Sequence, residues 1–125
     1  MKDPWNPTAE EIRQWAAEAD SYCPDQDWAL LFLDDSNYDA LLVELAGDAG
    51  CPRVKRDSFL TILYKVVAAA VCGAEARSFS DLGELFRQAE ATRDIDLRLW
   101  VRRSRQLIAN PRKYRTRLCW RGTGL

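Results

Sequence analysis

Histidine is absent from all 125 positions of this chain, which limits the chemistry its other side chains can perform. Without it, the Ser-His-Asp and Cys-His arrangements of nucleophilic catalysis are excluded, and the commonest metal ligand is missing. The four cysteines, at positions 23, 51, 72 and 119, form no C-x-x-C pair that would mark a zinc site or a redox disulfide. The six glycines form no phosphate-binding loop. We therefore expect a protein that is not an enzyme and that holds no metal or cofactor.

Two cysteines precede proline, in the dipeptides Cys23-Pro24 and Cys51-Pro52. The Cys-Pro dipeptide resembles the haem-regulatory motif, in which a thiolate binds haem iron. Haem ligation usually needs a defined partner at the second axial position, and no histidine is present to supply it. Proline is also expected just ahead of a helix, because its fixed φ suits the first helical position. Haem is therefore not predicted.

Cys51 has a second possible role, as a reactive thiol. Arg53, Lys55 and Arg56 come shortly after it, and positive surroundings lower the pKa of a thiol. No base stands near it in the sequence, so we expect an ordinary loop with solvated charges.

Apolar runs long enough to direct secretion or to cross a membrane are not found in the sequence. The start, MKDPWNPTAEE, lacks the apolar run of secretory signals, and no apolar window is long enough to span a bilayer. A cytoplasmic protein without membrane contact is expected. In that compartment all four cysteines should be thiols.

Charge is strongly segregated along the chain, although the net charge is only −1. Residues 1–50 contain twelve acidic and two basic residues, whereas residues 51–125 contain sixteen basic and seven acidic ones. The acidic half lacks a calcium-loop frame, because Asp25-Gln26-Asp27 is followed by Trp28. Its carboxylates are expected on solvated helix faces, with Asp34 and Asp35 as candidate interaction residues.

The basic half ends in a segment, residues 98–121, that carries nine lysines and arginines and no acid. Helical spacing places Arg98, Arg102 and Arg105 on one face of one helix and Lys113, Arg117 and Arg121 on one line of the next. Trp100, Tyr114 and Trp120 stand among them. Basic residues interleaved with aromatic ones are typical of nucleic-acid binding. The isoelectric point of about 5.5 is far below that of usual nucleic-acid binders, so this function is kept as the alternative.

The elements that must position these residues are predicted to be helices. Apolar residues recur at helical spacing nearly throughout, and no stretch alternates with period two. The sequence predicts an all-α fold of about seven helices in a single domain, residues 1–125, with an extended arm at 1–7 and a frayed end at 122–125. A loose repeat of about forty residues leaves two arrangements open, a HEAT/armadillo-like stack of helical hairpins or an irregular bundle.

Capping signals and breakers predict where these helices begin and end. The first helix is expected over residues 8–20, and a short second one comes after Cys23-Pro24. Thr8 with Glu11 forms a capping box for the first helix, and Ser36 with Asp39 forms one for the third. The third helix should run to about Ala46 and end at Gly47 or Gly50. The fourth and longest is expected over residues 57–73, buried on most of its circumference.

Three further helices are expected in the basic half. The fifth begins at Ser78 or Ser80, the sixth carries Leu97 to Ile108 and stops at Asn110-Pro111, and the seventh carries Tyr114 and Leu118.

We expect residues 98–121 to pack on the body of the domain, with Trp100 and Leu118 mostly buried. Its arginines should face solvent or pair with acids from residues 8–39, because apolar burial outweighs surface ion pairs in fixing a segment. The function expected from these features is a protein-interaction module that binds an unknown protein partner through its charged faces. An enzyme that uses acidic residues is the third interpretation.

Overall fold

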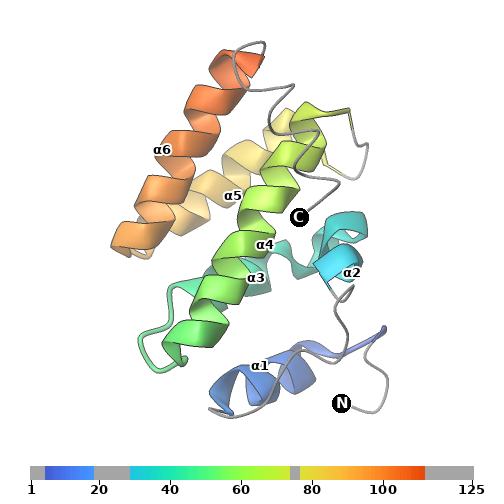
Figure 1. Ribbon diagram of the computed structural model, residues 1–125, viewed down its shortest axis with the longest axis vertical. Coiled ribbons are helices and arrows are strands. Elements are labelled where there is room, and N and C mark those ends of the chain that lie inside the picture. Colours follow the sequence, from blue (N-terminus) through green and yellow to red (C-terminus); the bar gives the residue numbers. More distant parts are fainter. Residues whose placement is uncertain (1–4, 19–28, 74–76, 112–125) are drawn as a thin grey trace.

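The computed structural model describes residues 5–18, 29–73 and 77–111 (Figure 1). These residues form six α-helices and one 3-10 helix without a strand, packed in one compact domain, so the all-α prediction is confirmed. The elements are α1 (Ala9–Ala17), α2 (Ala29–Asp34), η1 (Ser36–Tyr38), α3 (Asp39–Ala46), α4 (Arg53–Val71), α5 (Phe79–Ala91) and α6 (Ile95–Ala109). Residues 1–4 of the expected arm, the seventh helix and residues 122–125 lie outside the described ranges.

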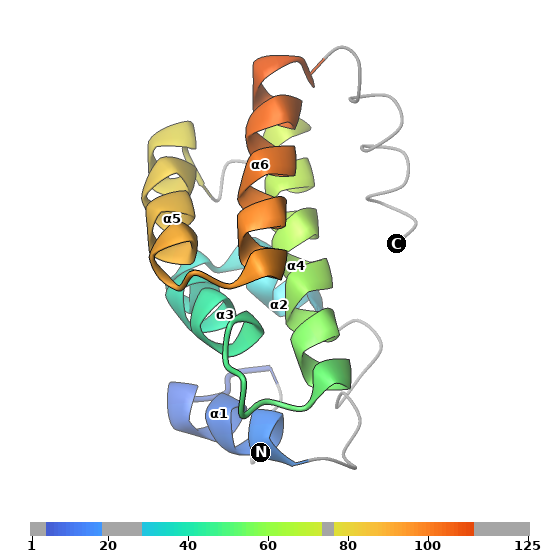
Figure 2. The same cartoon turned by 90° about the vertical axis from the view of Figure 1, so that its left-hand side faces the viewer.

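Two helical hairpins, α3–α4 and α5–α6, form the body of the fold. Within each hairpin the two helices pack together; between the hairpins, α3 contacts α5 and α4 contacts α6. Helices α4 and α6 run in the same direction side by side (Figure 2). This is the stacking of successive hairpins, one of the two arrangements that the sequence left open. Helix α1 packs on α3, and α2 packs on α4.

Side-chain caps fix the starts of three helices. Thr8 and Glu11 form the predicted capping box of α1, and Ser78 and Asp81 form a second one at α5. The backbone N–H of Ser78 donates to Asp81 and lowers the pKa of that carboxyl, with the Ser78 side chain contributing further. Asp94 caps α6 by accepting a hydrogen bond from the backbone N–H of Leu97. Each of these caps lies within four residues, which is why such motifs can be predicted locally.

The predicted capping box of Ser36 and Asp39 is wrong. Asp35 is the residue that caps η1, by accepting from the N–H of Asn37, and α3 begins at Asp39 with no side-chain cap. The carboxylate of Asp39 instead binds Arg77, which lies 38 positions away in the sequence. A long-range ion pair has thus replaced the local cap.

The longest helix, α4, begins at Arg53, four residues earlier than predicted. Pro52 is its N-cap, with an extended backbone, so proline stands directly before the first helical residue. The helix is buried on most of its circumference, as predicted. Ala68 is among its buried residues.

Apolar and aromatic contacts hold the hairpins and flanking helices together. Trp15 of α1 meets Phe59 of α4 edge to face, with ring centroids 5.8 Å apart, and Phe86 of α5 meets Trp100 of α6 at 5.2 Å. Trp100 has no exposed surface, which confirms the prediction for this residue, and its Nε1–H has no hydrogen-bond partner among the described residues. Leu118 lies outside the described part of the chain.

Arg77, just ahead of α5, is a buried arginine that the sequence did not single out. Its Nε and Nη2 donate to the two carboxylate oxygens of Asp39 at 2.7 and 2.6 Å. Its Nη1 and Nη2 donate to the carbonyls of Leu33 and Phe32 at 2.8 and 2.5 Å. One guanidinium therefore ties the end of α2 and the start of α3 to the segment that leads into α5.

Cys72, the C-cap of α4, is disulfide-bonded. The expectation that all four cysteines are thiols is therefore wrong for this residue. Cys51 is free, so the bond does not join these two cysteines. Cys23 and Cys119 lie outside the described residues.

Cys51, in the loop that connects α3 to α4, is buried, and its thiol donates to the carbonyl of Ala16 at 3.5 Å. Burial raises the pKa of this thiol, and the nearby Asp48 raises it further, against an opposing effect of Lys55 and Arg56. Burial is the largest of these effects. Lys55 donates to the carbonyl of Trp15, and Arg56 to the carbonyl of Ala46 and to Asp94.

We therefore predict that Cys51 of the native protein reacts with iodoacetamide at least about tenfold more slowly than in the unfolded chain, because alkylation needs an accessible thiolate. Peptide mapping by mass spectrometry after timed labelling measures this rate, with the guanidinium-denatured protein as the reference. Equal rates in the two states would show that Cys51 is an accessible, reactive thiol.

Candidate functional site: a basic groove between α5 and α6

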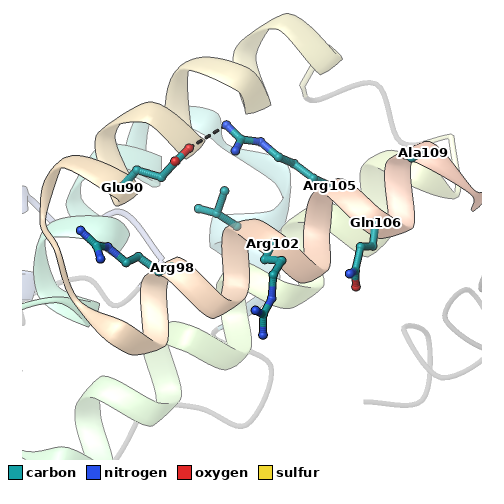
Figure 3. A pocket seen from close by; sticks show the side chains of 7 residues that line it. Glu90, Arg98, Arg102, Arg105, Gln106 and Ala109 are labelled. Atoms are coloured by element: carbon teal, nitrogen blue, oxygen red, sulfur yellow. Dashed lines mark hydrogen bonds and ion pairs between the residues drawn. The ribbon is translucent and has the colours of Figure 1, made fainter.

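An open groove of about 600 Å³ runs along α6 beside α5 (Figure 3). One residue of α5 and six residues of one face of α6 line it: Glu90, Arg98, Val101, Arg102, Arg105, Gln106 and Ala109. Three arginines against one glutamate give the lining a net charge of +2. We call this surface the basic groove. The helical spacing of the arginines brings them together, as the sequence predicted.

The arginines of the basic groove extend in two directions (Figure 3). Arg98 and Arg105 lie on the side of α6 that faces Glu90, whereas Arg102 and Gln106 point away from it. Arg105 Nη2 donates to Glu90 Oε1 at 2.6 Å, and its guanidinium lies 5.8 Å from the centre of the Phe86 ring. Arg105 therefore ties α6 to α5 and has part of its charge neutralised.

Arg98 and Arg102 differ from Arg105 because their side chains form no ion pair or hydrogen bond within the described part of the chain. Both are exposed. By contrast, Arg53 pairs with Asp96, and Arg56 pairs with Asp94. The positive charge of the groove that is available to a ligand is thus concentrated on Arg98 and Arg102.

A second, smaller groove of about 510 Å³ lies around the same two arginines. Arg98 and Arg102 line it together with Ile95 and Leu99. Ile95 is 81% exposed, which is unusual for a large apolar side chain, and Leu99 is half-buried. The two open arginines therefore stand among apolar side chains.

The expectation for arginine pairing is met in one respect only. Arg98 and Arg102 face solvent, as one of the two alternatives allowed, but in the described residues no arginine of α6 pairs with an acid from residues 8–39; Arg105 pairs with Glu90. In the described ranges the acidic and basic halves are joined by the ion pair of Arg77 with Asp39, whereas Arg13 pairs with Glu44 inside the acidic half. Among the described residues, no acid of residues 1–50 pairs with an arginine of the basic groove.

The other predicted interaction residues lie apart from the groove. Asp34 is the last residue of α2 and is exposed, and Asp35 caps η1. Lys113, Arg117 and Arg121 lie outside the described residues, together with the aromatic residues Tyr114 and Trp120.

Six residues of these grooves were missed by the sequence interpretation: Glu90, Ile95, Leu99, Val101, Gln106 and Ala109. Glu90 carries no local signal, because its position opposite Arg105 depends on how α5 packs against α6. Ile95 has a local signal, since it stands directly after the cap Asp94 and outside the apolar face that contains Leu97 and Trp100.

The groove offers little for catalysis among the described residues. Glu90 is the one carboxylate in its lining, and that carboxylate is paired with Arg105. No group of three cysteine, aspartate or glutamate side chains in ranges 5–18, 29–73 and 77–111 is placed to hold a metal ion. None of the helices in these ranges has the length and apolar character needed to cross a membrane.

Comparison with known proteins gives the chain no relatives: no family model, no curated protein and no solved structure has a significant match to it. The function must therefore be argued from the groove itself.

Proposed function

We propose that this chain is a non-catalytic protein-interaction module, and that its basic groove binds an acidic segment of a partner protein. The observation that carries the proposal is the pair Arg98 and Arg102, which are one helical turn apart, exposed and without partners in the described residues. An arginine usually finds a carboxylate when one is near, as Arg53, Arg56, Arg77 and Arg105 do here. We therefore infer that the carboxylates that pair with Arg98 and Arg102 come from a ligand.

The apolar side chains around these arginines favour a protein ligand. Ile95 and Leu99 add apolar surface to the positive charge. Contacts to such side chains contribute through burial, at roughly 25 cal/mol per Å², while guanidinium groups recognise carboxylates with paired hydrogen bonds. A segment that alternates acidic with apolar side chains would use both.

Nucleic acid is the alternative, and the described residues of the two grooves lack the aromatic stacking contact that it uses. Trp100 is fully buried against Phe86, so its ring cannot stack on a base. None of the described residues that line the two grooves is aromatic. Phosphate contacts from Arg98 and Arg102 remain, but without stacking they predict only weak, salt-sensitive binding.

The proposal is tested with the double variant Arg98→Gln/Arg102→Gln and a labelled peptide that alternates glutamate and leucine. Removing both charges should weaken binding about tenfold, since each exposed contact contributes up to about 1 kcal/mol and 1.4 kcal/mol corresponds to a factor of ten. Fluorescence anisotropy at moderate salt measures the affinity, and a single-stranded DNA oligonucleotide of matched charge is the comparison ligand.

The matched control is Arg13→Gln/Arg87→Gln, which removes the same charge from α1 and α5 outside the groove lining. It should leave peptide affinity within about twofold, because both arginines pair at the surface with Glu44 and Glu84. Equal losses in the two variants would mean that net charge, and not the groove, binds the peptide. Tighter binding of DNA than of peptide would favour the alternative function.

A further inference from the structure

A second exposed surface, on α2, combines apolar and acidic side chains. Leu30 is 52% exposed, and Asp34 stands one helical turn later on the same face. Phe32 is fully buried and stands about 200° away on the helix, since successive residues are about 100° apart. The face of Leu30 and Asp34 therefore points away from the core. We call it the α2 patch.

Asp34 does not stabilise α2 through a contact among the described residues. Among the described residues no ion pair or hydrogen bond involves its side chain, and it stands at the C-terminal end of α2, where a negative charge is unfavourable to the helix dipole. Its carboxylate is thus available for a contact outside the molecule.

The α2 patch and the surface of α6 around Ile95 and Leu99 are complementary. Each combines exposed apolar area with charge, and the charges are opposite: Asp34 on one, Arg98 and Arg102 on the other. Leu30 and Ile95 are both large apolar side chains left more than half exposed. The two surfaces belong to different sides of the molecule, because α4 lies between α2 and α6 (Figures 1 and 2).

From this arrangement we propose that the chain binds a second copy of itself head to tail, with the α2 patch of one copy against Ile95, Arg98, Leu99 and Arg102 of the next. Complementary surfaces on opposite sides give a heterologous contact that extends into short chains, not a two-fold dimer. The proposal rests on the proposed function in using Arg98 and Arg102 as docking residues, and a bound acidic partner would compete with the second copy.

The contact is small, so the association should be weak. Sedimentation velocity of the full chain from about 10 μM to about 1 mM should show the mean mass rising with concentration and falling with added salt. Asp34→Lys should abolish this rise, because it places like charges in contact. Glu10→Lys, which makes the same charge change on α1 outside the proposed contact, should leave the rise intact.

Mixing two blocked variants tests the head-to-tail geometry. Asp34→Lys keeps its α6 surface, and Arg98→Gln/Arg102→Gln keeps its α2 patch, so each alone should remain monomeric. In their mixture the intact α2 patch meets the intact α6 surface, whereas the two altered surfaces carry no opposite charges, so the mixture should form a dimer and nothing larger. A wild-type protein that stays monomeric over the whole range overturns the proposal, and so does a mixture that remains monomeric or an Asp34→Lys variant that still associates.

The failure of this proposal can be told apart from failure of the proposed function. Asp34→Lys keeps the basic groove, so it should bind the glutamate-leucine peptide as tightly as wild type. Peptide binding without self-association leaves the proposed function standing and overturns the head-to-tail contact. Self-association that survives Arg98→Gln/Arg102→Gln also overturns it.

Discussion

Replacing Arg77 with alanine is expected to lower the free energy of unfolding by about 3–5 kcal/mol, because removing one partner of a buried ion pair leaves the other charge unpaired. The Arg77 side chain is 2% exposed and that of Asp39 12%. The substitution also leaves the carbonyls of Phe32 and Leu33 without their donors. Urea unfolding followed by circular dichroism measures the change.

A second variant distinguishes the ion pair from general loss of packing. In Arg77→Met/Asp39→Leu both charges are absent, so the double variant should be more stable than Arg77→Ala, although the two carbonyls still lose their donors. Arg77→Ala within about 0.5 kcal/mol of wild type would contradict the role given to this arginine.

Replacing Trp100 with alanine is the second change expected to have a large effect, about 3–5 kcal/mol of lost stability, because it empties a fully buried aromatic site between α5 and α6. Trp100→Phe should cost less, since a ring still packs on Phe86 and the unpartnered Nε1–H is removed. Thermal and urea unfolding measure both variants.

The stability of a variant in the basic groove is the comparison for Trp100→Ala. Arg98→Gln/Arg102→Gln should change stability by less than about 0.5 kcal/mol, because both side chains are exposed and lack partners in the described residues. This contrast tests whether apolar burial fixes α6 on the body of the domain and leaves its arginines available. A groove variant that unfolds as readily as Trp100→Ala would mean that the arginines hold the helix.

The sequence could predict those parts of the fold that depend on neighbouring residues. The capping box of Thr8 and Glu11 and the stop at Asn110 are local features that the structure confirms, and α3 ends at Gly47, one of its two predicted glycines. The predicted cap of α3 was wrong because a distant partner binds Asp39, and the predicted start of α4 was four residues late although Pro52 stands directly before Arg53. Asp39 faces Arg77, and Arg53 and Arg56 face Asp96 and Asp94, about 40 positions away in each case.

The candidate site was predictable to the same extent. Helical spacing alone puts Arg98, Arg102 and Arg105 on one face, and the structure brings them into one groove. Spacing could not show that Glu90 neutralises Arg105 while Arg98 and Arg102 stay open, because that difference depends on the packing of α5. Spacing also could not show that Trp100 is fully buried in the core, so that its ring is not part of the basic surface.

The claim that the basic groove binds an acidic protein segment is tested most directly by the arginine side-chain Nε–Hε resonances in a two-dimensional NMR titration with the glutamate-leucine peptide. We predict that Arg98 and Arg102 shift first and most, that Arg105 comes next as the peptide competes with Glu90, and that the internally paired Arg56 and Arg77 do not move. Equal shifts at every exposed arginine, or none at Arg98 and Arg102, would contradict it.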